Sequence, residues 1–322
     1  MEFFVGATYY PKSMKLPQQD LGLETIQSAP KPFLRWAGGK RKLTSLLMDA
    51  IPDQFNPKEH RFFEPFVGGG ALMLALGNPS APVHVSGRNL YINDMNPDLI
   101  STYKIIRDDV QELIKDLEVM GSDLTKRQFE AVRAMTPRDE VERAARFIYL
   151  NKTCFNGLWR VNSSGQFNVP WGKLKSPLIF DAQNLISVSQ RLKNSKITNA
   201  DFQNATEKVQ EGDFVYFDPP YIPLSSSSSF SQYAMANFNE TNHRQLADTI
   251  KILKKKKAFV ILSNSDTPLT REIFGPILNL HQVSMARSIS ASAGSRKSVN
   301  EILATNFVVK KGSTISMLKV IS

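Results

Sequence analysis

The sequence contains very few of the residues that build disulfides or metal sites, and it has no long apolar run. Among its 322 residues there is one cysteine, Cys154, which excludes a disulfide within the chain and fits a reducing compartment. The four histidines are scattered without metal-ligand spacing, so we expect no bound zinc or other metal. No apolar stretch approaches the roughly 18–20 residues that a membrane span needs, and the first residues lack the apolar segment of a signal peptide. These absences predict a cytoplasmic protein that does not bind membranes.

The chain does carry the composition of a globular protein and an excess of basic charge. Its length allows one large domain or two, and its 42% of hydrophobic residues is enough for a full core. The formal net charge of +10 favours a polyanionic partner. Charge alone does not distinguish nucleic acid from a membrane surface or from a simple contribution to solubility.

Hydrophobic periodicity divides the chain into an extension and an α/β core. Residues 1–30 mix proline, glutamine, serine and charge, and we expect them to form a flexible extension. Strand patterns occur at residues 61–66, 83–92, 197–202, 213–218, 259–263 and 303–309. Helical patterns occur at residues 43–51, 71–74, 98–150 and 185–192.

The tetrapeptide Asp218-Pro219-Pro220-Tyr221 directly follows a short apolar run. It indicates a buried strand that stops abruptly, because proline has no backbone N–H and holds the preceding residue in an extended conformation. A carboxylate, a carbonyl and an aromatic face at one strand end could hold both hydrogens of a planar amino group. The tetrapeptide alone fits an ordinary strand end with a proline turn equally well.

A glycine-rich segment, Gly68-Gly69-Gly70, lies between a predicted strand and a predicted helix. Asp94 follows at the end of the next strand, near the offset at which an acidic residue binds ribose hydroxyls. The dinucleotide fingerprint fails, because Met73 stands where its third glycine belongs. A nucleoside without phosphates fits better, although a tight strand–helix turn also needs glycine for steric reasons.

Six segments then carry a resemblance to a known family. They are FLRWAGGKRKL (33–43), FFEPFVGGGAL (62–72), YINDMNPDLI (91–100), FNGLWRVNSSGQFNVPWG (155–172), FVYFDPPYIPLS (214–225) and RSISASAGSRKSVNEILATN (287–306). In this order they resemble the Dam-type (class alpha, D12) DNA adenine-N6 methyltransferases from about residue 33 to residue 307.

The resemblance implies an α/β fold with a Rossmann-like methyltransferase core and a mixed, mostly parallel sheet. The core would comprise residues 31–105 and 195–322. A helical DNA-recognition domain, residues 106–194, would be inserted into it and would carry a β-hairpin at 155–172.

The resemblance also implies the chemistry, with S-adenosylmethionine as methyl donor, S-adenosylhomocysteine as product and no metal. Asp218 and the Pro219 carbonyl would each accept a hydrogen bond from the adenine N6, and Pro220 would complete the rigid turn. Tyr221 would stack on a base flipped out of the duplex. The cofactor residues implied are Trp36, Lys40, Phe66, Gly68, Gly70, Asp94 and Asp218. We add Asp201, another acidic residue at a predicted strand end, as a candidate for the same pocket.

Double-stranded DNA is the partner that the resemblance implies, with 5′-GATC-3′ as the expected target. Arg160 would pair with a guanine, Leu158 and Pro170 would touch thymine methyls or base edges, and Arg35 would contact an outer base pair. Phe155 would insert beside the flipped base. The DNA-contacting residues implied are Arg35, Phe155, Asn156, Leu158, Arg160 and Pro170. We add Arg296 and Lys297 as candidate phosphate contacts, because they flank a loop rich in serine and glycine.

Two other functions stay open at this point. The enzyme could methylate another amine, such as cytosine N4, RNA or a glutamine amide, or the chain could be a catalytically idle DNA-binding module. We expect a monomer in the nucleoid of a bacterial or phage setting. A restriction endonuclease that acts on the same site is a further partner consistent with the resemblance.

Overall fold

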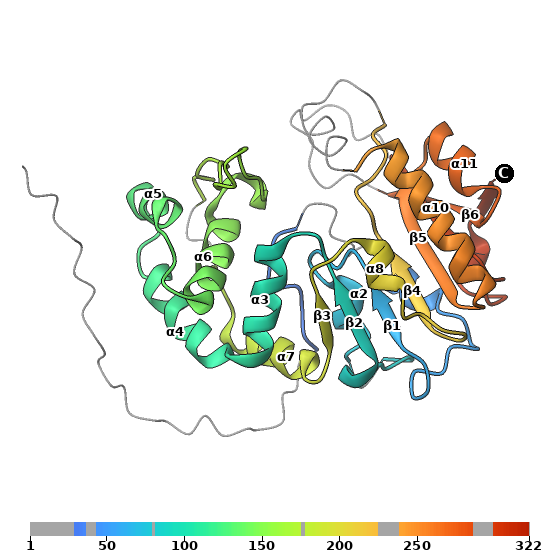
Figure 1. Cartoon of the computed structure of the whole chain (residues 1–322), viewed down its shortest axis with the longest axis horizontal. Coiled ribbons are helices and arrows are strands. Elements are labelled where there is room, and N and C mark those ends of the chain that lie inside the picture. Colours follow the sequence, from blue (N-terminus) through green and yellow to red (C-terminus); the bar gives the residue numbers. More distant parts are fainter. Residues whose placement is uncertain are drawn as a thin grey trace, which may run out of the picture.

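The computed structural model describes residues 29–36, 43–78, 81–174, 178–224, 238–285 and 299–321. Across these residues a mixed sheet forms the centre of the molecule (Figure 1). Its eight strands there are β1 (Phe62–Glu64), β2 (Leu90–Asn93), β3 (Lys196–Thr198), β4 (Phe214–Phe217), β5 (Phe259–Ser265), β6 (Asn279–Met285), β7 (Val299–Thr305) and β8 (Lys319–Ile321).

The strands lie in the order β3-β2-β1-β4-β5-β7-β6-β8. From β3 to β5 each neighbouring pair is parallel. From β5 to β8 each neighbouring pair is antiparallel. The α/β class and the mixed sheet predicted from the sequence are therefore confirmed.

The two faces of the sheet bury different hydrophobic clusters, because side chains alternate along each strand. Phe62 and Tyr216 lie in one cluster with residues of α1 (Thr44–Asp49), α2 (Ala71–Ala75) and α3 (Pro97–Asp108). Phe63, Val215 and Phe217 lie in the other. The helices that contribute to this second cluster are α8 (Phe202–Thr206), α10 (Glu240–Lys255) and α11 (Pro268–Phe274).

A group of helices lies beside α3, on the side away from the sheet in Figure 1. It is formed by α4 (Val110–Gly121), α5 (Lys126–Ala134) and α6 (Glu140–Thr153). The chain returns to the sheet through α7 (Ala182–Leu192), which leads into β3. Helices α5, α6 and α7 begin at side chains that accept a hydrogen bond from the first turn, as helix starts commonly do. This group falls within the predicted recognition domain, residues 106–194, whose boundaries stay a prediction.

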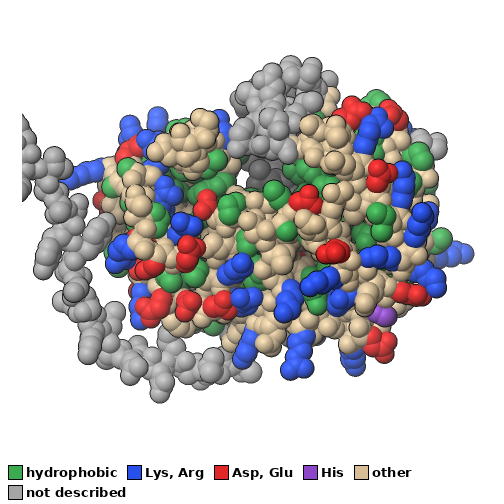
Figure 2. Space-filling view, viewed as in Figure 1, with side chains coloured by type: hydrophobic (Ala, Val, Ile, Leu, Met, Phe, Trp, Pro, Cys, Tyr) green, Lys and Arg blue, Asp and Glu red, His purple; other side chains and the backbone are tan. Residues whose placement is uncertain are grey.

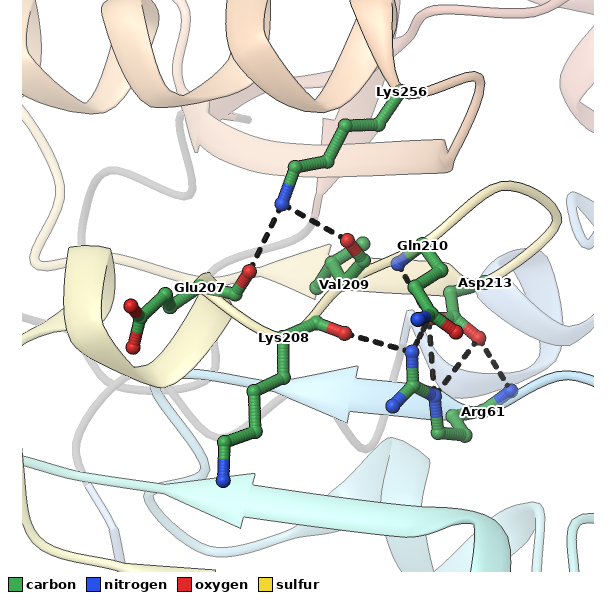
Figure 3. Close-up of polar contacts among 7 residues, drawn as sticks. All are labelled: Arg61, Glu207, Lys208, Val209, Gln210, Asp213 and Lys256. Atoms are coloured by element: carbon green, nitrogen blue, oxygen red, sulfur yellow. Dashed lines mark hydrogen bonds and ion pairs between the residues drawn. The ribbon is translucent and has the colours of Figure 1, made fainter.

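At the edge of the sheet where the parallel strands begin, Arg61 and Asp213 hold β1 against β4 (Figure 3). The Arg61 amide donates to Asp213 Oδ1 at 2.8 Å, and its guanidinium lies 2.6 Å from Oδ2. Asp213 is buried, and this pairing offsets the cost of removing its charge from water. Lys256, from the basic run that follows α10, donates to the carbonyls of Glu207 and Val209.

Lysine and arginine side chains gather along this lower edge of the molecule (Figure 2). In the run at residues 254–257, Lys257 pairs with Glu211 and Lys254 donates to the carbonyl of Ile277. These contacts fit the ordinary structural role of a helix end before a buried strand.

One predicted strand is partly a helix. Residues 197–202 form β3 only as far as Thr198. The Asp201 side chain accepts hydrogen bonds from the amides of Gln203 and Asn204, and this starts α8 at Phe202.

The strand expected at residues 303–309 begins and ends earlier, as β7. It stops at Thr305 because the Asn306 side chain bonds both the Val260 amide and the Ala258 carbonyl. Strands β6 and β8 were not anticipated. None of the helices in the described ranges is long and apolar enough to cross a membrane.

Candidate active site

Four parallel strands end at one edge of the sheet, and a site segment follows each of them. Residues 65–70 follow β1, residues 94–96 follow β2, residues 199–201 follow β3 and residues 218–221 follow β4. From β1 the chain builds β2 and β3 on one side, whereas β4 and β5 lie on the other. Ligands of open α/β sheets bind at such a reversal, outside the carboxyl ends of the strands.

The glycine turn after β1 is packed from both sides by large rings. Gly68 and Gly70 adopt φ of +46° and +67°, a left-handed conformation that favours glycine. A Cβ on Gly68 would lie 2.7 Å from the Trp36 indole, so this ring rests directly on the turn. On the buried side, the Tyr103 hydroxyl donates to the Gly68 carbonyl at 2.9 Å. The turn is therefore held rigid and offers backbone rather than side chains.

Asp94, at the end of β2, binds this same turn. Its Oδ2 accepts from the Gly68 amide at 3.1 Å and its Oδ1 from the Asn96 amide at 3.0 Å. Burial raises the pKa of Asp94, although these amide hydrogen bonds oppose the rise. Each carboxylate oxygen can accept more than one hydrogen bond, so the group retains capacity for a ligand hydroxyl.

The end of β3 is tied to the end of β2 by two asparagines. Asn93, which is buried, donates to the carbonyls of Pro65 and Ala200 and thereby joins the loops after β1 and β3. Asn199 donates to the Asp94 carbonyl at 2.8 Å. The carboxylate of Asp201, a predicted cofactor residue, is used to cap α8.

Phe66 lies in a group of aromatic rings. Its ring stacks on Phe202 with centroids 5.7 Å apart and meets Phe238 edge-on at 5.6 Å. Phe217 at the end of β4 lies 6.3 Å away. Phe66, which precedes the glycine turn in the chain, thus belongs to an aromatic group with Phe202, Phe217 and Phe238.

The Asp218 carboxylate is held by a side chain of the neighbouring strand β5. Ser263 donates to Asp218 Oδ1 at 2.7 Å, and the Tyr216 hydroxyl lies 3.0 Å from the same serine oxygen. Glu64, at the end of β1, is buried and accepts from the Met73 amide. Burial and then the charge of Asp218 hold the pKa of Glu64 well above its usual range. Two carboxyl groups therefore share this part of the site, one of them buried.

The residues after Asp218 are also fixed to the neighbouring strands. Pro219 is buried, and Pro220 is exposed. The Tyr221 hydroxyl donates to Glu301 Oε2 at 3.1 Å, and the next amide, of Ile222, donates to Asn264 Oδ1 at 3.0 Å. The turn is therefore attached through both a side chain and the backbone.

The predicted DNA-contacting residue Arg35 lies against the distant hairpin segment. Buried Asn151 accepts from the Arg35 amide and donates to the carbonyls of Arg35 and Gly157, at 2.8, 2.8 and 3.0 Å. A Cβ on Gly157 would lie 2.4 Å from the Arg35 Cβ, so the two segments touch closely. The side chain of Arg35 is exposed.

Residues 155–172 fold back on themselves with two bridging pairs, Cys154 with Trp171 and Val161 with Phe167. Arg160 is exposed, and its Nε donates to Asn168 Oδ1 at 2.7 Å across the fold. Trp159 packs on Phe147 of α6, which anchors this hairpin to the helices.

The other predicted members of this surface are presented differently. Phe155 is 50% exposed and Asn156 has a left-handed φ of 54°. Pro170 is exposed and accepts from the Phe155 amide, whereas Leu158 is partly buried against the core. Lys40, Arg296 and Lys297 lie outside the described residues.

Several residues that build this site were missed by sequence reasoning. They are Glu64, Asn93, Tyr103, Asn151, Ser263 and Glu301. Polar residues inside otherwise apolar segments were the available signal, because buried polar groups need specific partners. Among the described residues no cluster of three His, Cys, Asp or Glu could hold a metal ion.

The mixed sheet, with the site segments at the carboxyl ends of its parallel strands, points to a class of protein: the fold is consistent with an S-adenosylmethionine-dependent methyltransferase. Residues 36–289 match the family described as D12 class N6 adenine-specific DNA methyltransferase. The chain belongs to this family. It is an adenine-specific DNA methyltransferase, and the predicted family and enzyme class are confirmed.

The chain is similar to named relatives along most of its length. It is 40% identical to the Type II methyltransferase M1.LlaDCHI of Lactococcus lactis subsp. cremoris, over 86% of this chain and 95% of the relative. It is also 40% identical to the Type II methyltransferase M.MjaIII of Methanocaldococcus jannaschii, over 86% and 99%. The DNA adenine methylase of Haemophilus influenzae is 34% identical over 85% and 93%.

Proposed function

We propose that this enzyme methylates the N6 atom of an adenine flipped out of double-stranded DNA, within 5′-GATC-3′, and uses S-adenosylmethionine as donor. The observation that carries the proposal is the position of Asp218-Pro219-Pro220-Tyr221. This turn follows β4, and the glycine turn follows the neighbouring strand β1. Both turns therefore lie at the carboxyl ends of adjacent parallel strands, where the strand order reverses. In Figure 1 the chain after β4 and the hairpin after α6 both lie on the upper side of the molecule.

The residues beside the glycine turn fit an adenosyl group. Trp36 and Phe66 offer apolar ring surface, and the buried glycines Gly68 and Gly70 let the side chains of Trp36 and Tyr103 approach the turn closely. The Asp94 carboxylate at the next strand end suits ribose hydroxyls. These residues, with Asp218, would hold the cofactor, which when bound supplies a methyl group on positively charged sulfur. For Asp201 we propose only an indirect part, because its carboxylate caps α8.

Asp218 and Pro219 would prepare the adenine nitrogen for the transfer. The exocyclic amine is a weak nucleophile, since its lone pair is delocalised into the ring. Hydrogen bonds from N6 to the Asp218 carboxylate and the Pro219 carbonyl favour a localised lone pair. The bound cofactor would supply the methyl carbon to N6 and would keep the electrons of its own carbon–sulfur bond, so the positive charge would pass to the amine. N6 would then release one proton to solvent, and Asp218 would stabilise the positive charge until that proton leaves.

The hairpin and Arg35 would read the DNA. Exposed Arg160 can form the bidentate contact that arginine makes with guanine in the major groove. Its bond to Asn168 orients the guanidinium before DNA arrives. Half-exposed Phe155 can fill the gap that a flipped base leaves.

Methyl transfer from labelled S-adenosylmethionine tests the proposal directly. The full chain is given a duplex with one GATC site and a matched duplex in which that adenine is replaced. We expect label on the first duplex only, recovered as N6-methyladenine. Equal label on both duplexes would refute the target sequence and keep the chemistry. No label on either, with cofactor still bound, would refute the proposed function.

Two variants assign the parts. Asp218→Ala should abolish transfer and leave the protein folded. Arg160→Ala should weaken discrimination between GATC and a duplex altered at its guanine by about 1–3 kcal/mol, the usual contribution of one bidentate base contact. An unchanged preference in Arg160→Ala would show that this side chain does not read the guanine.

A further inference from the structure

One face of the sheet changes from apolar to polar toward the catalytic edge. Along β4, Phe214 and Tyr216 point to the same face, and the alternation places Asp218 there too. On β5, Ile261 lies in the same cluster, and Ser263 follows two residues later. Strand β7 lies beside β5 and contributes Glu301 next to Ser265. Three strands therefore direct polar groups toward the residues at 218–221.

Ser263 is fully buried, and the use of its single proton is defined. Because the Ser263 hydroxyl donates to Asp218, the Tyr216 hydroxyl 3.0 Å away must donate to Ser263. Burial, followed by the charge of Asp218, holds the pKa of Tyr216 well above its usual range. This tyrosine hydroxyl therefore keeps its proton at neutral pH, and the hydrogen bonds run in one direction from Tyr216 through Ser263 to Asp218.

A second contact orients the aromatic ring of the turn. The Tyr221 hydroxyl donates to Glu301 on β7, a strand that is far from Tyr221 in the sequence. Burial and nearby charges, that of Asp218 first, hold the pKa of Tyr221 well above its usual range. The hydroxyl thus remains a donor, and the ring is fixed at its far end.

We propose that Ser263 and Glu301 are positioning residues for methyl transfer: Ser263 fixes the Asp218 carboxylate, and Glu301 fixes the plane of the Tyr221 ring. The inference rests on the roles proposed above for Asp218 and Tyr221. Neither Ser263 nor Glu301 needs to touch substrate or cofactor. Small misplacement of reacting groups is costly, since a shift of about 1 Å can reduce a rate roughly 100-fold.

Single-turnover methyl transfer to a GATC duplex, with separate measurement of cofactor and DNA affinity, tests the Ser263 arm. Ser263→Ala should slow transfer by roughly 10–100-fold while both dissociation constants stay within about threefold, because Asp218 is only one of several residues that hold the two ligands. The matched control is Ser187→Ala, which removes the hydroxyl of another buried serine, bonded to the Gln183 carbonyl, from α7. Its transfer rate should stay within about twofold of the parent, as expected for a change outside the site.

The Glu301 arm uses rescue by a conservative substitution. Glu301→Gln keeps an oxygen that accepts from Tyr221 and should retain the transfer rate within about threefold, whereas Glu301→Ala should lose roughly tenfold. Tyr221→Phe keeps the ring and removes the donor, so adding Glu301→Ala to it should cause no further loss. Additive losses in this pair would overturn the Glu301 assignment.

The outcomes separate this inference from the proposed function. A parent-like rate in Ser263→Ala, with Asp218→Ala inactive, would overturn the positioning role and leave the proposed function standing. An equal loss in Ser187→Ala and Ser263→Ala would also overturn it, since the effect would then reflect stability. If Ser263→Ala does not fold, Tyr216→Phe takes its place and should slow transfer at unchanged affinities. Activity in Asp218→Ala would instead refute the proposed function itself.

Discussion

Replacing Gly70 by alanine should destabilise the protein far more than the same change at Gly312. Both glycines have positive φ, +67° and +88°. Each substitution then costs about 1–2 kcal/mol for the left-handed backbone, offset by about 0.4–1 kcal/mol from the less flexible unfolded chain. At Gly312 nothing lies within 4 Å of the added methyl, so the net cost should be about 1 kcal/mol.

At Gly70 the methyl would meet the Tyr103 hydroxyl at 2.7 Å and the end of Met73 at 2.8 Å. Met73 can shift, but Tyr103 is fully buried and its hydroxyl is bonded to the Gly68 carbonyl. Breaking that bond adds about 1–3 kcal/mol. The total is about 3 kcal/mol.

Urea unfolding followed by circular dichroism measures the free energy of unfolding of both variants. Cofactor affinity of the folded protein is measured alongside, and it should fall in Gly70→Ala alone. Equal unfolding free energies for Gly70→Ala and Gly312→Ala would refute the reasoning, because Tyr103 would then yield without cost.

Three further predictions concern residues outside the catalytic turn. Asp213→Ala should lower the free energy of unfolding by about 2–4 kcal/mol, since it leaves Arg61 without its partner, whereas Asp53→Ala, in an exposed ion pair, should cost under about 0.5 kcal/mol in the same urea titration. Burial lowers the pKa of His243 to about 4, so the unfolded chain binds the proton more readily, and stability from this group falls as pH drops below about 6.5. Between pH 7.5 and pH 5 the parent should lose about 1–2 kcal/mol more than His243→Leu, and parallel pH profiles would contradict this. Burial raises the pKa of Cys154 to about 11, so it should react with a disulfide reagent only after unfolding, and Cys154→Ala should keep methyl transfer within about threefold.

The sequence patterns located the strands and helices that carry the strongest local signals. The apolar run before Asp218 is β4, the glycines do open α2, and residues 98–150 hold the four helices α3 to α6, with short loops between them. These elements follow from periodicity and from residues with restricted backbone geometry, which act within a few positions. Strands β6 and β8 were missed, because β6 mixes polar and apolar residues without regular alternation and β8 has only three residues.

The residues of the candidate site also differ in whether local sequence reveals them. Motif residues such as Asp94 and Asp218 were found because they stand at strand ends within the sequence. Asn151 and Glu301 were not, since their partners Arg35 and Tyr221 are distant in the chain and meet them only after folding. Asp201, which was expected to line the pocket, also has a local role as the cap of α8, and its part in the pocket stays a prediction.

Arg35 and Trp36 are consecutive, yet they face different tasks. Asn151 clamps the backbone of Arg35 to the hairpin segment, while the Trp36 indole lies on the glycine turn. Under the proposed roles, a single peptide unit separates the cofactor pocket from the DNA surface. A shift of the Trp36 indole should therefore also strain the hydrogen bonds between Asn151 and the Arg35 backbone. The two ligands should then be thermodynamically linked, and linkage is reciprocal. The factor by which DNA changes cofactor affinity should equal the factor by which cofactor changes DNA affinity, and Asn151→Ala should bring both toward one.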